Sequence, residues 1–196
     1  MFCIDTFFPQ WRELVIHESS PVHRGASERL RLQASSYMPT QFFPNVTPGD
    51  SFNGCRCENL EEMTIGNDSI DLHITQDVFE HLFDPAAAFR EIARTLRPGG
   101  AHVFTTPLVQ KNNPSQFSAQ IAPDGTITYN TPAEYHRNAI SEEGSLVTVK
   151  WGYDIAKYIF EACGLFTQIV FIDNLELGIR AEYIEVLITH KPPLRC

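Results

Sequence analysis

The clearest pattern of hydrophobic and polar positions in this chain lies between residues 70 and 107. Residues 70–76 alternate apolar and polar side chains, which predicts a β-strand. A second short β-prone run surrounds Val103 and Phe104. The segment between them predicts a helix, because its apolar residues recur at the i, i+3, i+4, i+7 spacing: Phe89, Ile92, Ala93 and Leu96. The pattern therefore predicts one strand–helix–strand unit.

The sequence also predicts where this helix begins and ends. Asp84 can cap the first turn, and Pro85 suits the first helical position. The Pro-Gly-Gly run at residues 98–100 is expected to end the helix. Two strands joined by one covering helix form a right-handed parallel crossover, and ligands of such sheets bind beyond the carboxyl ends of the strands. We therefore expect a functional rim at residues 76–81.

The chain before this unit predicts further short elements. A helix is expected at residues 27–33, with Leu30 and Leu32 as its apolar residues. Residues 39–53, which are rich in proline, predict a surface excursion. Short strands are expected at residues 14–16, 34–39 and 54–60. This order of strands and helices favours an α/β sheet over a β-sandwich.

The chain after this unit begins with an irregular stretch. Residues 108–150 are too long for a simple connection, so we expect a long loop or lid insertion within one domain. A helix is expected at residues 151–165, where Gly164 supplies the stop. Residues 167–172 and 183–189 predict two strands that close the sheet as an antiparallel hairpin.

Composition limits the class of protein. With 196 residues and 43% hydrophobic content, residues 1–196 are expected to form a single domain. A formal net charge of -9 argues against nucleic acid or an anionic membrane as the main partner. The first residues lack the basic segment and long apolar stretch of a secretion signal, so a cytoplasmic location is expected.

The cysteines point to reduced thiols. There are five, an odd number at irregular spacing, which does not suit a disulfide framework. Cys55 and Cys57 could form half of a metal site, but no second cysteine pair or close histidine pair accompanies them. We therefore predict no metal site.

The central unit carries a longer motif. A strand is followed by Asp-Val-Phe-Glu-His at residues 77–81, then by Asp-Pro, and the helix ends in Leu-Arg-Pro-Gly-Gly before a strand that ends in Thr-Thr-Pro. Over residues 68–107 this succession resembles the class I S-adenosylmethionine-dependent methyltransferases, and in particular a methyltransferase type 11-like domain. The HESSP, EYH and SLVTVKWGYD stretches resemble a bacterial subgroup of this family that is often found beside glycosyltransferases.

This resemblance implies a fold and a cofactor. The fold is a Rossmann-like, seven-stranded, mostly parallel sheet with helices on both faces, strand order 3-2-1-4-5-7-6, and strand 7 antiparallel. The cofactor is S-adenosylmethionine. The chain departs from the family after its first strand, where His-Glu-Ser-Ser-Pro at residues 17–21 replaces the usual glycine-rich turn and Gly25 is the only nearby glycine. Arg24 is a candidate partner for the methionine carboxylate.

The resemblance also implies individual cofactor-binding residues. They are Glu18, Ser19 and Ser20 beside the methionine portion, Tyr37 at the end of the second strand beside the ribose, Glu58, Asn59 and Leu60 beside the adenine, and Gln76 and Asp77 beside the sulfonium. For Asp77 the alternative is that it only caps the next turn.

Methyl transfer to a hydroxyl needs alignment and is helped by a general base, for which His136 and His81 are the candidates. His81 could instead bond backbone groups and hold the following helix. The function expected is methyl transfer to a small-molecule or saccharide acceptor; the alternative is a methyltransferase-like binding or scaffolding module without catalysis. A dinucleotide enzyme is less favoured, because no Gly-x-Gly-x-x-Gly follows the first strand.

Overall fold

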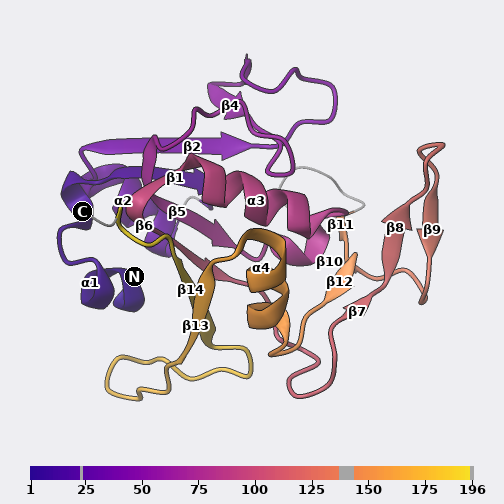
Figure 1. Cartoon of the computed structure of the whole chain (residues 1–196). Coiled ribbons are helices and arrows are strands. Elements are labelled where there is room, and N and C mark those ends of the chain that lie inside the picture. Colours follow the sequence, from indigo (N-terminus) through magenta and orange to yellow (C-terminus); the bar gives the residue numbers. More distant parts are fainter. Residues whose placement is uncertain (23, 137–143, 195–196) are drawn as a thin grey trace.

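The computed structural model describes residues 1–22, 24–136 and 144–194, and its centre is an eight-stranded sheet (Figure 1). The strands of this sheet are β1 (Val15–Ser19), β2 (Ser36–Gln41), β3 (Ser51–Phe52), β4 (Cys55–Cys57), β5 (Ile70–Gln76), β6 (Leu96–Thr105), β13 (Phe166–Phe171) and β14 (Glu185–His190). Their order is β13-β14-β6-β5-β1-β2-β4-β3.

The predicted topology is confirmed. Strands β4, β2, β1, β5 and β6 pair in parallel, whereas β14 is antiparallel to both β6 and β13. This is the expected order 3-2-1-4-5-7-6, with one difference: the two-residue strand β3 adds an antiparallel eighth strand at the edge beside β4.

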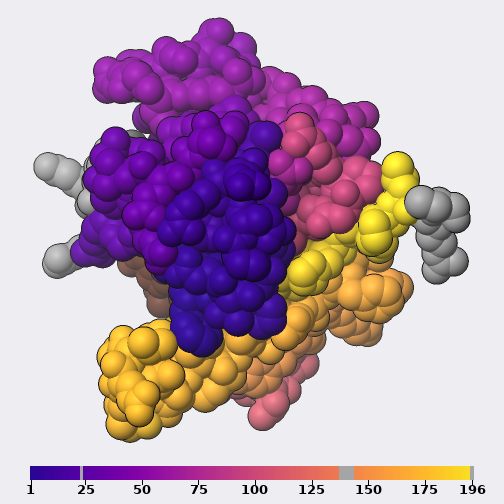
Figure 2. Space-filling view, turned by 90° about the vertical axis from the view of Figure 1, so that its left-hand side faces the viewer, coloured from indigo at the N-terminus to yellow at the C-terminus, as the bar shows by residue number. Residues whose placement is uncertain are grey.

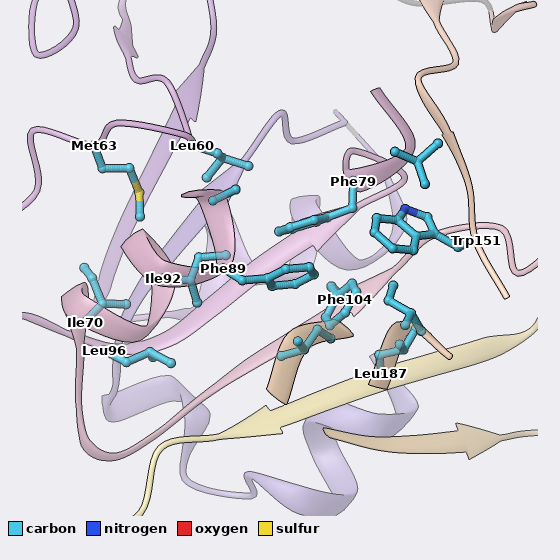
Figure 3. Packing of buried hydrophobic residues seen from close by; sticks show 14 of the residues in the cluster. Leu60, Met63, Ile70, Phe79, Phe89, Ile92, Leu96, Phe104, Trp151 and Leu187 are labelled. Carbon is cyan, nitrogen blue, oxygen red and sulfur yellow. The ribbon is translucent and has the colours of Figure 1, made fainter. Parts of the chain in front are cut away.

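Helices cover both faces of the sheet and enclose two hydrophobic cores. On one face, α1 (Phe2–Phe7), the 3₁₀ turn η1 (Trp11–Glu13) and α2 (Gly25–Gln33) pack on the first core. On the other face lie the 3₁₀ turn η2 (Phe79–His81), α3 (Pro85–Thr95) and α4 (Ile155–Cys163). In the second core, the ring of Phe79 stacks on Phe89 with centroids 4.2 Å apart, and Phe104 and Trp151 pack nearby (Figure 3).

Helix α3 begins as predicted and ends earlier. The carboxylate of Asp84 accepts a hydrogen bond from the amide of Ala87 at 2.9 Å, with Pro85 in the first turn. The helix ends at Thr95, and Leu96 is already extended, so the predicted stop at residues 98–100 is wrong. Gly100 instead allows its backbone to approach that of Asp71 closely, because a Cβ atom at Gly100 would lie 2.9 Å from the carbonyl oxygen of Asp71.

Other predicted boundaries shift as well. The first strand does not end in a polar loop at residue 17, since β1 runs through buried residues to Ser19. Leu30, on the inner face of α2, is fully buried. Leu32, on the same helix, is 64% exposed and is not part of the core. The last helix begins at Ile155, four residues later than predicted. It ends before Gly164, which has a left-handed backbone conformation, so the predicted stop is confirmed.

Strand β5 is buried on both faces, which the alternating pattern did not predict. A bulge between Ile70 and Leu72 places these two side chains in different cores. The polar residues His73 and Thr75 are fully buried as well. Central parallel strands are covered on both sides, so their polar residues must find hydrogen-bond partners inside the protein.

Three buried histidines lie side by side on the face under α3. His17 is registered with His73, and His73 with His102, across β1, β5 and β6. The Nε2 atom of His17 lies 2.8 Å from the hydroxyl of Thr40, and the Nε2 atom of His73 lies 2.8 Å from that of Thr95. Burial lowers the pKa of His17 to about 4 and that of His102 to about 3, and it holds the pKa of His73 well below its ordinary value.

The described parts of the expected 108–150 insertion contain short strand pairs instead of an irregular loop. These pairs are β7 (Gln116–Phe117) with β12 (Val149–Lys150), β8 (Ala119–Ile121) with β9 (Ile127–Tyr129), and β10 (Tyr135–His136) with β11 (Ser145–Leu146). Residues 137–143 lie outside the described part. The β8–β9 pair projects away from the sheet (Figure 1).

Figure 2 shows the face that carries the amino-terminal residues, which spread between the region that follows β2 and the β13–β14 hairpin. None of the helices in the described part of the chain has the length and apolar content that crossing a bilayer requires. The four cysteines described in the structure are unpaired.

Candidate functional site

A buried carboxylate lies at the carboxyl end of β1. Glu18 is fully buried and accepts hydrogen bonds from three neutral donors. These donors are the hydroxyl of Ser27 at 2.6 Å, the hydroxyl of Tyr37 at 2.7 Å and the side-chain amide of Gln76 at 2.7 Å. Three predicted cofactor residues, Glu18, Tyr37 and Gln76, therefore meet at one point of the sheet edge. Ser27, on α2, is a fourth member that the sequence did not indicate.

The placement of Tyr37 at the end of the second strand is wrong. Tyr37 is near the start of β2, in register with Ile16, and the strand continues to Gln41. The hydroxyl of Tyr37 instead reaches across to Glu18, and burial together with this hydrogen bond raises the pKa of Tyr37 above its ordinary value. The last residue of β2, at the carboxyl edge of the sheet, is Gln41.

The loop after β1 keeps a turn that usually needs glycine. Ser19 is buried at the end of the strand, and Ser20 has a φ of 56°, in the left-handed region that glycine adopts most readily. Gly25 also has a positive φ, of 60°, and begins helix α2. The residue before the helix, Arg24, makes no side-chain cap to the first turn of α2, and a helix amino terminus of this kind favours an anionic group.

Gln76 and Asp77 lie at the carboxyl end of β5, as predicted. The amide of Gln76 also donates to the hydroxyl of Ser27 at 3.0 Å. Asp77 is exposed, has a φ of 52°, and accepts a hydrogen bond from the hydroxyl of Thr105 at 3.0 Å. Its carboxylate is thus held at the open edge between β5 and β6.

The segment expected to meet the adenine is largely committed to the protein itself. Glu58 is buried and accepts from the guanidinium of Arg56 at 2.7 Å and from the amide of Thr64 at 2.9 Å. The side chain of Asn59 accepts from a nearby backbone amide. Leu60 is 4% exposed and packs in the core under α3. The side chains of these residues are therefore occupied by contacts within the protein.

His81 and His136, the two candidate bases, lie together although they come from different parts of the chain. Their rings meet edge to face with centroids 5.3 Å apart. The Nδ1 atom of His81 lies 2.8 Å from the carbonyl oxygen of Leu146, so this nitrogen donates. The backbone contact expected as the structural alternative for His81 therefore exists, and it leaves Nε2 free to act.

Glu80, which lies in the expected rim at residues 76–81, completes this cluster. Its Oε1 atom lies 3.7 Å from Nε2 of His81, and its Oε2 atom accepts from the hydroxyl of Thr106 at 2.9 Å. Glu80 is 2% exposed, and burial raises its pKa to about 7. Burial also lowers the pKa of His81. Glu80 can therefore exchange a proton near neutral pH, whereas burial favours the neutral form of His81.

Two cavities lie at the carboxyl edge of the sheet. One, of about 230 Å³, is bounded by α1, Gln76, Thr105 and the link between β13 and β14. The other, of about 160 Å³, is lined by Glu80, Pro107, Val109, Glu134, His136, Val147, Val149 and Lys150. Along the chain, Asp77 comes after Gln76 of the first cavity and before Glu80 of the second, and Thr106 lies between Thr105 and Pro107 in the same way. Both residues therefore lie at the edge between the two cavities.

Comparisons with known proteins find methyltransferases similar to part of this chain. Residues 30–104 match the family model described as a methyltransferase domain. A Mycolicibacterium smegmatis protein named a probable S-adenosylmethionine-dependent methyltransferase is 41% identical over 49 residues. That match covers 25% of this chain and 19% of the longer relative.

Solved structures extend the likeness to nearly the whole chain. An S-adenosylmethionine-dependent methyltransferase from Mesorhizobium loti has a TM-score of 0.55 at 15% identity, over 96% of this chain and 94% of that chain. A second is the 1,6-didemethyltoxoflavin-N1-methyltransferase of Burkholderia thailandensis, solved with 1,6-didemethyltoxoflavin and S-adenosylhomocysteine. It has a TM-score of 0.55 at 14% identity, over 97% of this chain and 76% of that chain. At these identities the likeness establishes the fold.

Proposed function

We propose that this chain, in which residues 30–104 match a methyltransferase domain, is a class I S-adenosylmethionine-dependent methyltransferase that binds S-adenosylmethionine and methylates a small-molecule or saccharide acceptor. The observation that carries the proposal is the meeting of Glu18, Tyr37 and Gln76 at the edge where β1 and β5 end. Open parallel sheets bind their ligands at this edge.

The methionine end of the cofactor fits the loop after β1. Ser20 takes the left-handed backbone conformation that the family's glycine-rich turn requires, so the chain can still turn closely beneath a ligand. The uncapped amino terminus of α2 and the guanidinium of Arg24 would hold the methionine carboxylate. Gln76 and Asp77 would border the sulfonium, whose positive charge suits the exposed carboxylate of Asp77.

The ribose end fits less closely than in the family. Tyr37 is turned toward Glu18, so Gln41 and the backbone beyond β2 are the groups left to meet the ribose hydroxyls. An amide accepts hydrogen bonds more weakly than a carboxylate. We therefore expect weaker cofactor affinity than an acidic residue at this edge would give.

The acceptor would lie on the side of His136. When bound, the cofactor supplies an electrophilic methyl group on a sulfonium, which an acceptor atom displaces directly. The chain's own residues then have to align the acceptor and receive its proton. His136, His81 and Glu80 line or border one cavity with Lys150, a polar set that suits a hydroxylated acceptor.

Calorimetric titration with S-adenosylmethionine and S-adenosylhomocysteine tests the cofactor assignment. We expect one-to-one binding of both. Substitution Arg24→Gln should weaken binding about tenfold or more through loss of a charge-assisted hydrogen bond, whereas Arg12→Gln, on the exposed turn η1, should not change it. Absence of binding by well-folded protein would overturn the enzyme proposal and favour the binding or scaffolding module.

A further inference from the structure

One oxygen of the buried Glu80 carboxylate has no hydrogen-bond partner among the described residues. While Oε2 accepts from Thr106, Oε1 is fully inaccessible and receives nothing. A buried carboxylate oxygen without a donor is costly, and such atoms are rare in folded proteins. Glu80 and His136 both line the same cavity, so a cation bound beside them would give this oxygen a partner.

An imidazole nitrogen with a free lone pair lies near this oxygen. A carbonyl only accepts hydrogen bonds, so Nδ1 of His81 carries the proton donated to Leu146 at 2.8 Å. Nε2 of neutral His81 is therefore an acceptor, and it lies 3.7 Å from Oε1 of Glu80. Two hydrogen-bond acceptors that face each other repel unless a proton or a metal ion lies between them. A backbone carbonyl that holds the second nitrogen is also the usual support of a metal-binding histidine.

His136 supplies a third ligand from another segment. It lies on β10, which pairs with β11 so that His136 is opposite Ser145, next to the residue that holds His81. The hydroxyl of Thr148 donates to the carbonyl of Glu80 at 3.1 Å and so ties η2 to the same strand region. One ligand atom each of Glu80, His81 and His136 lies within 4.8 Å of the others.

We propose that Glu80, His81 and His136 bind a divalent transition-metal ion. Two imidazole nitrogens and one carboxylate oxygen form the donor set that catalytic zinc sites and non-haem iron sites use, with positions left open. Metal–ligand bonds of about 2.1 Å place ligand atoms about 3.4 Å apart in a tetrahedral site. The 3.7 Å between Glu80 and His81 is already close to this spacing, so binding requires only a small approach of His136.

Lys150 does not take the place of the ion. Its ammonium group shares the cavity, but it lies 2.7 Å from the carboxylate of Glu134, which neutralises it. The alternative to a bound metal ion is a proton on the carboxylate of Glu80, which would also remove its buried negative charge. These two possibilities differ in a measurable way, because metal binding would displace that proton and protonation alone binds no metal.

An ion at this place has open positions that face the cavity. Apolar side chains of Val109, Val147 and Val149 line one part of the wall and Glu134 and Lys150 another, so an oxygen ligand of the ion would lie between apolar and charged groups. On the proposed methyltransferase function, that ligand is the acceptor hydroxyl, which the ion would orient and make more acidic. Binding of the metal itself does not depend on that function.

Metal binding can be measured directly on the full chain after chelator treatment. Titration with Zn²⁺ in the calorimeter should show one ion per chain. The heat should vary with the ionisation enthalpy of the buffer, because Glu80 releases a proton. Addition of Co²⁺ should give visible absorption without the intense near-ultraviolet band of thiolate ligands, which separates this cluster from Cys55 and Cys57.

The variants identify the ligands. His136→Gln, on an edge strand, and Glu80→Gln, which can keep the bond to Thr106, should each weaken binding at least about tenfold. His190→Gln is the matched control, because His190 pairs with Ala101 at the opposite end of the sheet. Circular dichroism and thermal melting establish that each variant is folded.

Three outcomes would overturn the proposal: no stoichiometric binding by the native chain, binding that survives both His136→Gln and Glu80→Gln in folded protein, or a thiolate spectrum. Titration with S-adenosylmethionine in the same series keeps the two proposals separate. A native chain that binds the cofactor and no metal rejects only the metal site, and a native chain that binds the metal and no cofactor rejects only the cofactor assignment.

Discussion

The Nδ1 atoms of His17 and His73 lie 2.7 Å apart at the centre of the sheet, so one of them must carry a proton and the other must accept it. The hydroxyl of Thr95 donates to the carbonyl of Glu91 at 2.8 Å, and it therefore accepts from Nε2 of His73. His73 is then the acceptor at Nδ1 and His17 the donor, and Nε2 of His17 accepts from Thr40. The network is complete with both rings neutral.

This arrangement predicts that stability falls in mild acid. The pKa of His17 is lowered from 6.5 to about 4, so below pH 6.5 the unfolded chain takes up protons that the folded chain refuses. Each such imidazole removes about 1.4 kcal/mol of unfolding free energy per pH unit between the two values. Urea unfolding at pH 7.5 and pH 5 should show a clear loss at pH 5, followed by continued loss toward pH 4.

Glu80 acts in the opposite sense and offers a control. Its pKa is raised from 4.5 to about 7, so its contribution to stability is present at low pH and is lost as pH rises through this range. In Glu80→Gln, which cannot titrate, stability should fall more steeply between pH 7 and pH 5 than in the native chain. A flat profile in both proteins would contradict the neutral histidine network.

His73 and His102 should differ sharply when each is replaced by leucine. His73→Leu leaves the Nδ1–H of His17 and the hydroxyl of Thr95 without their partner, which should lower the free energy of unfolding by about 2–3 kcal/mol. His102 bonds only Thr75, at 3.0 Å, and its Nδ1 is buried without a partner among the described residues. His102→Leu should therefore cost less than about 1.5 kcal/mol. Equal losses in urea unfolding would argue against the directed network.

Asp77→Ala should weaken S-adenosylmethionine binding. Loss of a carboxylate beside the sulfonium should raise the dissociation constant about tenfold or more, as measured by calorimetry. Alanine at a φ of 52° is also strained, so Asp77→Asn is the matched variant, since asparagine tolerates this conformation. If Asn binds as tightly as Asp, the charge has no role and Asp77 only shapes the turn.

His136→Gln should separate binding from turnover. Because His136 lies on the acceptor side, cofactor affinity should stay within about twofold. Formation of S-adenosylhomocysteine in the presence of acceptor should slow about 100-fold or more, the usual loss when an acid–base or polarising group is removed. A large drop in cofactor affinity would place His136 on the wrong side of the site.

Asp84→Ala should destabilise the fold by about 1 kcal/mol, because it removes the hydrogen bond to the amide of Ala87 at the start of α3. Asp84→Asn keeps an acceptor oxygen and should lose only a few tenths of this amount. The measurement is the urea midpoint at neutral pH. Cofactor affinity, measured in parallel, should be unchanged in both variants, because Asp84 lies beyond η2 on the outer side of the helix start.

The local signals in the sequence predicted the framework well. The cap and proline at residues 84–85 located the start of α3, and Gly164 located the end of α4. These features act within one turn of chain, so a single sequence displays them. Leu32 shows where that reasoning fails: the residue is apolar and helical, but the face it occupies points away from the sheet. Only the packing of α2 on its neighbours decides which leucine is buried.

The candidate site shows the same division. The sequence determined that residues 76–81 follow a central strand and that two histidines deserve attention. The tertiary structure decided that Tyr37 bonds Glu18 and that His136 returns beside His81, close to an oxygen of Glu80 that has no partner among the described residues. Helix caps, turns and strand patterns depend on neighbours in the chain, whereas hydrogen bonds and metal ligands depend on distances between segments far apart in it. The strand–helix–strand unit could therefore be predicted from the sequence, whereas the side-chain contacts of the candidate site could not.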